Sequence, residues 1–177
     1  MRHCLLALAL LIGCSSAGPY GYSRTYAPLG AEEDAADGAR EYDPVMAERD
    51  KAEWKKGKVS VFGIVTKRVA GPGGEAYLTL SVRTLEVRNL CDQLDEQTCR
   101  VTVGEHEFAI VHAKLKLSPA DDIGGKSVNR GSLVRVIGKL TDEVDPEDGT
   151  PVFKADYYRH WPRNFFVTTA SRPDMPM

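Results

Sequence analysis

The sequence has no hydrophobic run long enough to cross a membrane as a helix. Its most apolar run, Leu5–Ile12, has eight residues, whereas a helix that spans a bilayer needs about 20. A basic excess is also missing, because 23 lysines and arginines stand against 25 aspartates and glutamates, for a net charge of -2. Proteins that bind nucleic acid through its phosphates usually carry a clear positive excess. We therefore expect no nucleic-acid partner.

Catalytic motifs are missing as well. The sequence contains no Gly-x-Ser-x-Gly nucleophile motif and no His-Glu-x-x-His zinc motif. Its acidic residues are scattered through turn-like segments, and no pair of them stands out as a glycosidase dyad. We therefore expect no enzyme activity, no catalytic residues, no cofactor and no metal site. An enzyme of an unrecognised type is the less favoured alternative.

The first 14 residues follow the pattern of an export signal. Arg2 supplies a positive charge before Leu5–Ile12, which has the length of a signal-peptide core. The run closes as Leu-Ile-Gly-Cys, ending at Cys14. This resembles the lipobox of bacterial lipoproteins, Leu-x-(Gly/Ala)-Cys, which is cleaved just before the cysteine. The resemblance implies that residues 1–13 are a signal peptide and that Cys14 carries a diacylglyceryl thioether and an acylated amino group.

The residue after the lipidated cysteine bears on the location. In the lipoprotein family an aspartate there tends to retain the protein in the inner membrane, and here that position is Ser15. We therefore expect a lipid-anchored outer-membrane protein on the periplasmic face, with the inner membrane and the cell surface left open. Two or more acyl chains hold a protein on a bilayer almost permanently. Removal of the signal takes 177 residues to 164 and, with the loss of Arg2, lowers the net charge by one to -3.

Cysteine is scarce, with four residues in the chain. Cys4 lies in the expected signal peptide and has no expected role. Cys91 and Cys99 flank a short polar loop, and an exported protein folds in an oxidising compartment, so we expect a structural disulfide between them. Such a loop closure stabilises a fold by about 2–3 kcal/mol. A metal or redox pair is the alternative, although the spacing is not Cys-x-x-Cys and no second ligand cluster accompanies it.

The next part of the chain divides into a tether and a helix. Residues 15–42 are rich in small, polar and acidic residues without apolar periodicity, which predicts a lipidated flexible tether over residues 14–42. Asp43 and Pro44 then form a helix-start pattern, with the aspartate as N-cap. We expect a short helix over residues 43–57, anchored by Trp54 and ended by a glycine.

From residue 58 the pattern changes to short strands. Alternating or β-branched runs indicate strands, and Gly- and Pro-rich segments indicate turns. The expected strands are Val59–Val65, Ala76–Val82 with a continuation through a bulge to Val87, Arg100–Val103, Glu107–Val111, Leu133–Leu140, Val152–Tyr158 and Asn164–Thr168, with turns at 71–74 and 145–149. We expect residues 58–170 to form one mainly β domain, a five- to six-stranded barrel, and residues 171–177 to form a frayed tail.

Three of these runs carry a second resemblance. Gly57–Val65, Gly131–Gly138 and Pro151–Tyr158 resemble strands of an OB-fold (oligonucleotide/oligosaccharide-binding) barrel, in which a glycine such as Gly63 lets the first strand curve strongly. The order of lipobox, tether, Gly-Lys-Val-x-x-x-Gly-x-Val and Val-x-Val-x-Gly also resembles the Slp family of outer-membrane lipoproteins. These resemblances imply a small OB-like barrel, and fold by itself carries little functional weight.

The candidate ligand or partner surface is Tyr157, Arg159, His160 and Trp161, at the end of the last long strand. Aromatic rings beside an arginine and a histidine can stack a ligand, as in proteins that bind single strands. The competing interpretation is that Tyr157 and Trp161 pack on the barrel rim or against Trp54.

Two other groups of residues could in principle bind a metal ion. His106 and His112 are six residues apart, too far to share one ion along a strand, and we expect both to face solvent. The acidic turn at Asp142–Asp148 has oxygen ligands for calcium but not the spacing of an EF-hand loop, so we expect a solvated turn.

These observations favour a lipid-anchored cell-envelope protein with a non-catalytic binding or scaffolding domain. Its expected partners are the membrane, through the anchor, and an envelope protein or a glycan. The alternative is an accessory subunit of an envelope complex that docks through the barrel. A concave, aromatic-lined groove beside Tyr157 would favour a binder, and an exposed apolar patch of several hundred Å² would favour a docking subunit.

Overall fold

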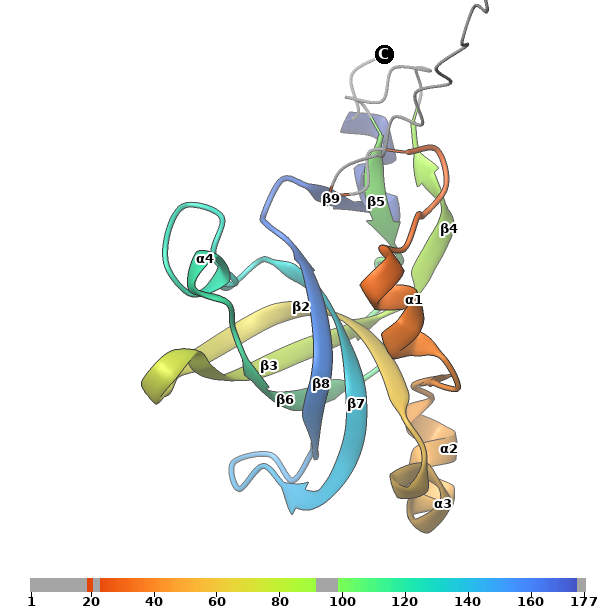
Figure 1. Ribbon diagram of the computed structural model, residues 1–177. Helices are drawn as coiled ribbons and strands as arrows, with labels where there is room; N and C mark the ends of the chain where they lie inside the picture. Colours follow the sequence, from red (N-terminus) through yellow and green to blue (C-terminus); the bar gives the residue numbers. More distant parts are fainter. Residues whose placement is uncertain (1–18, 21–22, 92–98, 175–177) are drawn as a thin grey trace, which may run out of the picture.

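The computed structural model describes residues 19–20, 23–91 and 99–174, and Figure 1 shows its ribbon. Within these ranges no helix has the length and apolar character of a membrane span. The elements in chain order are α1 (Gly30–Ala36), β1 (Arg40–Glu41), α2 (Pro44–Arg49), α3 (Lys51–Lys56), β2 (Val59–Ala70), η1 (Pro72–Gly74), β3 (Glu75–Arg83), β4 (Leu85–Leu90), β5 (Arg100–Val103), β6 (Ile110–Lys116), α4 (Pro119–Asp122), β7 (Leu133–Val144), β8 (Pro151–Trp161), β9 (Phe166–Thr168) and η2 (Thr169–Asp174).

Five strands close into a barrel in the order β2, β3, β6, β8 and β7, because β7 pairs with both β8 and β2. All neighbours are antiparallel except β6 and β8, which are parallel. This is the arrangement of an OB-like barrel, so the expected mainly β, OB-like fold is confirmed. Strand β1 adds to β2 in parallel, and β4, β5 and β9 form a second small sheet. Figure 1 places the second sheet at one end of the barrel.

Two glycines lie where neighbouring strands approach most closely. A Cβ at Gly63 would lie 2.9 Å from the Cβ of Leu80, and a Cβ at Gly138 would lie 2.1 Å from the carbonyl oxygen of Lys154. The register also shifts between Ile137 and Gly138. Side chains do not fit at these close approaches, which is the usual reason for glycine inside a curved strand. The close approach at Gly63 agrees with the role expected for it.

Alternation along the strands divides the apolar side chains between two clusters. The larger cluster fills the barrel, and the smaller one lies against the second sheet. Strand β2 supplies both, because its valines at 59, 61 and 65 point into the barrel and Phe62 points out of it. Phe62 meets Leu133, Val101, Val103 and Trp161 in the smaller cluster.

The helix expected over residues 43–57 begins as predicted but is broken in two. The Asp43 carboxylate accepts hydrogen bonds from the backbone N–H groups of Val45 and Met46 at 2.9 Å, and Trp54 is buried as the expected anchor. Asp50 has a non-helical backbone and caps α3 by accepting from the N–H of Glu53 at 3.2 Å. A second N-cap inside the segment therefore separates α2 from α3.

Several strand boundaries differ from the expectation, since β2 continues to Ala70, β7 to Val144 and β8 to Trp161, and β9 begins at Phe166. Strand β3 ends at Arg83 and β4 begins at Leu85, so the chain breaks where a bulge was expected, and β4 leaves the barrel for the second sheet. Strand β6 runs over Ile110–Lys116, later than the expected Glu107–Val111. Alternation of apolar residues predicts where strands lie, but it does not predict which strands pair with one another. The pairing depends on residues that are distant in the sequence.

The described part of the expected tether is folded onto the barrel, which corrects the prediction for residues 23–42. Helix α1 lies within this segment, and its Glu32 is completely buried. Tyr26 packs edge-on against Phe62, and its ring lies 5.9 Å from that of Trp161. Figure 1 shows α1 against the side of the barrel, below the second sheet. The smaller apolar cluster is thus completed by residues that looked like a linker.

Glu32 fastens this segment through two arginines of the barrel, in what we call the Glu32 clamp. Arg135 of β7 and Arg159 of β8 each donate a hydrogen bond to one of its carboxylate oxygens at 2.7 Å. Arg159 also donates to the carbonyl oxygens of Pro19 at 2.7 Å and Ala27 at 3.0 Å. The clamp therefore fixes the segment at three points along its length.

Burial alone would raise the pKa of Glu32, but the hydrogen bonds from Arg135, Tyr26 and Arg159 outweigh burial and hold this pKa below its usual value. Glu32 is therefore ionised at neutral pH and balances buried positive charge.

Replacement of Glu32 by alanine leaves the buried guanidinium of Arg159 without its carboxylate and leaves the half-buried Arg135 with only Glu41, at 3.3 Å. We expect the free energy of unfolding to fall by about 3–5 kcal/mol, because an uncompensated buried charge is costly. Urea unfolding followed by tryptophan fluorescence measures the change. The neighbouring exposed Glu33→Ala is the matched control and should change stability by less than about 0.5 kcal/mol. A loss below about 1 kcal/mol in Glu32→Ala would show that the clamp does not hold the segment.

Candidate functional site

The four residues predicted as a ligand surface do not form one exposed platform. Trp161 is completely buried and stacks on Phe62, with ring centroids 6.2 Å apart. Arg159 is 5% exposed and belongs to the Glu32 clamp. Trp161 therefore packs against the barrel, as the competing interpretation has it, whereas Arg159, although held by the clamp, borders the cavity described next.

Tyr157 and His160 instead line an open cavity of about 470 Å³, which we call the Tyr157 hollow. The parallel pairing of β6 and β8 covers only the residues from His112 and Val152 to Lys114 and Lys154. The hollow begins where this pairing ends. Its lining includes Tyr20, Lys116, Asp156 and Tyr158, besides Tyr157 and His160. It combines aromatic rings with charged groups of both signs.

Hydrogen bonds hold one wall of the hollow rigid. The Tyr158 hydroxyl donates to Asp121 at 2.6 Å, and the backbone N–H of Ser118 donates to that hydroxyl oxygen at 2.8 Å. His160 contacts the other oxygen of Asp121 at 3.3 Å through Nδ1, and its Nε2 lies 2.8 Å from the carbonyl oxygen of Lys126. The polar groups of Asp121, Tyr158 and His160 are thus bound to one another and to the wall of the hollow. Tyr157 is half-buried, and burial raises the pKa of its phenol, so it is neutral at physiological pH.

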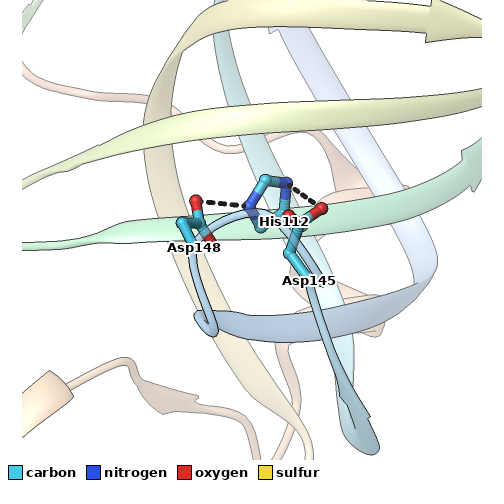
Figure 2. Close-up of side chains that lie close together, drawn as sticks. All are labelled: His112, Asp145 and Asp148. Carbon is cyan, nitrogen blue, oxygen red and sulfur yellow. Dashed lines mark hydrogen bonds and ion pairs between the residues drawn. The ribbon is translucent and has the colours of Figure 1, made fainter.

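A second cluster lies at the acidic turn and is drawn in Figure 2. His112 points outward from β6, since Val111 and Ala113 on either side of it lie in the core. The turn between β7 and β8 folds over this histidine, which is 4% exposed. Asp148 lies 3.0 Å from its Nε2, and Asp145 lies 3.6 Å from its Nδ1. The expectation that His112 faces solvent is therefore wrong, whereas His106 is exposed as expected.

Residues of β3 complete the surroundings of His112. The Tyr77 ring stacks on the imidazole at 5.2 Å, and its hydroxyl donates to Asp145 at 2.8 Å. The Thr79 hydroxyl lies 3.3 Å from His112 Nδ1. A protonated imidazole can donate to both carboxylates, whereas a neutral one can donate to Asp148 and accept from the threonine. The acidic turn is thus fastened across the outer face of β3 and β6 instead of lying free in solvent.

His112, Asp145 and Asp148 are also the only three ligand-type residues, among those the structure describes, with atoms that all lie within 4.8 Å of one another. An ion bound there would take one imidazole nitrogen and two carboxylates. In the structure each nitrogen of His112 faces a different carboxylate. The arrangement fits an imidazole held between two carboxylates better than a metal centre.

Cys91 and Cys99 are joined by a disulfide, which confirms the predicted pairing. The bridge connects the end of β4 to the start of β5, its antiparallel partner, and so links these two strands at one end of the second sheet. Cys14, the predicted lipidation site, lies outside the described residues. Compared with models of known protein families and with curated proteins, the chain matches none of them.

Sequence reasoning missed the His112 cluster because its members come from two separate parts of the chain. His112 directly follows the expected strand Glu107–Val111, and the aspartates belong to a turn more than 30 residues later. Only the parallel pairing of β6 with β8 brings them together. The aspartate-rich composition of the turn was the available signal, but it fits a solvated turn equally well.

Replacement of Asp148 by asparagine should reduce the acid sensitivity of the fold. Hydrogen bonds from the hydroxyl and N–H of Thr150, aided by His112, lower the pKa of Asp148 from 3.8 to about 2. Between these pH values the unfolded chain binds a proton that the folded chain does not, so stability falls as pH drops. We expect the decrease in melting temperature from pH 5 to pH 2.5 to be smaller by about 2 °C in Asp148→Asn.

The matched control is Asp156→Asn, because Asp156 is exposed and makes no hydrogen bond or ion pair with other described residues. Calorimetric scans at several pH values give the comparison. Equal pH dependence in Asp148→Asn and the unmodified protein would mean that the turn carboxylate is not held by its neighbours.

Proposed function

We propose that this chain is a lipid-anchored cell-envelope protein whose barrel binds a glycan without catalysing its conversion. The lipobox pattern ending at Cys14 supports the anchor. The disulfide between Cys91 and Cys99 supports an exported location, since such bonds persist mainly in oxidising compartments. The Ser15 position favours the outer membrane and its periplasmic face.

The observation that carries the binding proposal is the Tyr157 hollow. Small-ligand sites are concave, with aromatic walls and a few fixed polar groups, and the hollow has this composition beside Tyr20, Tyr157 and Asp156. Tyrosine faces suit the C–H face of a sugar ring, and carboxylate and ammonium groups suit its hydroxyls. The polar groups of Asp121 and His160 are already satisfied by the wall, which favours binding over acid–base chemistry.

The second candidate function is an accessory subunit that docks on a protein partner. It is favoured by a groove of about 850 Å³ between α2 and the β3–β4 region, which we call the Phe108 groove. Two apolar side chains along it are unusually exposed, Val45 at 65% and Phe108 at 50%. Apolar residues of this kind mark protein contacts when they gather in one patch. The groove is more apolar than the Tyr157 hollow, and the charged residues in its lining are Glu41, Asp43, Arg83 and Arg135.

Replacement of Cys14 by serine tests the anchor. We expect the unmodified chain, expressed in a bacterium with two membranes, to incorporate labelled palmitate and to partition into the detergent phase of Triton X-114. Cys14→Ser should lose both properties, because serine has no thiol to carry the diacylglyceryl group. Cys4→Ser is the matched control and should keep both. Mass spectrometry of an unmodified chain that still begins at Met1 would reject the anchor.

A photo-crosslinking amino acid at position 157 or at position 108 separates the two candidate functions. We expect the probe at 157 to yield adducts whose mass increments are those of sugar units, because it lines the hollow. The probe at 108 should yield no such adducts. Intact envelopes are irradiated before purification, and a third probe at exposed position 33 is the control. Protein-only adducts at 108, with none at 157, would reject the glycan-binding proposal in favour of the docking subunit.

A further inference from the structure

One end of the molecule gathers basic side chains around the place where the N-terminal segment docks. Lys126 lies over the rings of Tyr20 and Phe165, at 5.3 and 5.4 Å from their centroids. The carbonyl oxygen of Lys126 also contacts His160 at 2.8 Å. The loop before β7 and the loop after β8 therefore meet Tyr20 in one surface.

Two arginines extend this surface. Arg163 lies against Gly131, since a Cβ on that glycine would be 3.5 Å from the Arg163 Cδ. Arg130 precedes Gly131 in the chain, and Lys126, Arg130 and Arg163 are all exposed. Ile123 stands in the same loop and is 80% exposed. We call the surface formed by Ile123, Lys126, Arg130 and Arg163, with Tyr20 and Phe165, the basic end.

Acidic residues are absent from the sequence that builds the basic end. No aspartate or glutamate occurs from Ile123 to Thr141 or from Tyr157 to Pro173. Just before the first stretch, Asp121 is bound to Tyr158 and Asp122 is paired with Arg68. The acidic turn lies at the opposite ends of β7 and β8, and Figure 1 shows it at the far end of the barrel from the second sheet. The basic end is thus separated along these strands from the acidic turn, whose Asp142, Glu143 and Glu147 pair with lysines.

The number of residues between Cys14 and Pro19 limits the distance between the basic end and a lipid on Cys14. Arg159 holds the carbonyl of Pro19 at 2.7 Å, and Pro19 is five residues after Cys14. Five fully extended residues span at most about 18 Å. A lipid on Cys14 would therefore keep the basic end next to the bilayer, whatever conformation those residues adopt.

We propose that the basic end lies on an anionic phospholipid surface, with Ile123 entering the headgroup layer. The proposal rests on the lipid anchor of the proposed function and adds the face that the anchored protein turns to the membrane. Lysine and arginine beside a bilayer are attracted to anionic headgroups over about a Debye length, roughly 8–10 Å at physiological salt. An exposed isoleucine among them adds apolar contact with the interface. The acidic turn then points away from the membrane.

Collisional quenching on vesicles tests this orientation. The lipidated chain is reconstituted into vesicles of phosphatidylcholine, with or without phosphatidylglycerol, and carries a fluorophore on Ile123→Cys or, as a control position, on Glu147→Cys in the acidic turn. With phosphatidylglycerol present, we expect quenching by aqueous acrylamide to fall about two-fold or more at position 123. Quenching at position 147 should not change. High salt should restore access at 123.

A charge-reversal variant gives the second measurement. Lys126→Glu/Arg130→Glu/Arg163→Glu should restore acrylamide access at position 123 on anionic vesicles. The matched control Lys51→Glu/Lys139→Glu/Lys154→Glu has the same net charge but changes exposed lysines outside the basic end, and it should keep the protection. Near-ultraviolet circular dichroism verifies that both variants fold. The salt titration uses the chain without charge reversal, so its result holds even if a variant fails to fold.

Flotation before each quenching measurement separates this proposal from the proposed function. Protein that floats with the vesicles while position 123 stays equally open on both lipid mixtures would overturn the orientation and leave the anchor intact. Protein that does not float has no working anchor, and this outcome would overturn both. Protection of position 123 that neither salt nor charge reversal changes would reject the electrostatic basis of the contact.

Discussion

The buried carboxylate of Glu32 is the interaction on which the rest of the structure depends. Arg135 and Arg159 come from adjacent barrel strands and point to the same outer face, and their guanidinium groups, half-buried at Arg135 and buried at Arg159, need a counter-charge. The N-terminal segment supplies it, and in doing so brings Tyr26 onto Phe62 and Trp161. Buried ion pairs often add little net stability compared with apolar contacts, but they are strongly unfavourable when broken. The clamp therefore fixes where the segment docks, while the aromatic contacts supply much of the attraction.

Local rules account for the parts of the fold that the sequence predicted well. Asp43 caps a helix through its own neighbours, the turn at 71–74 follows from proline and glycine, and alternation marks the barrel strands. The disulfide followed from the expected export into an oxidising compartment and from the number of cysteines. The docked N-terminal segment could not be predicted this way. Its small and acidic residues have the composition of a linker, and only the two arginines, more than 100 residues away, give Glu32 a reason to be buried.

The candidate sites show the same division between local and distant information. Tyr157 to Trp161 look like an exposed cluster of aromatic and basic residues, and strand alternation even places Tyr157, Arg159 and Trp161 on one face of β8, but these side chains meet different neighbours along that face. Trp161 lies in the smaller apolar cluster, and Arg159 binds Glu32 in the clamp. Tyr157 and His160 line the hollow. His112 was expected in solvent because its own segment gives no sign of the turn that covers it. In each case the side chain's surroundings come from a strand or turn that is distant in sequence.

The short parallel pairing of β6 and β8 links the two ends of the barrel physically. On one side of it, His112 holds the acidic turn, and on the other side the strands separate to form the Tyr157 hollow. The lining of the hollow begins at Leu115 and Ala155, three residues beyond His112 and Val152, so the two places lie roughly 10 Å apart along the strands, about one Debye length at physiological salt. Protonation at the acidic turn can therefore reach the near edge of the hollow through the electric field as well as through a shift of the strands. Because the hollow begins where the pairing ends, its size depends on how firmly these three pairs of residues hold β6 against β8.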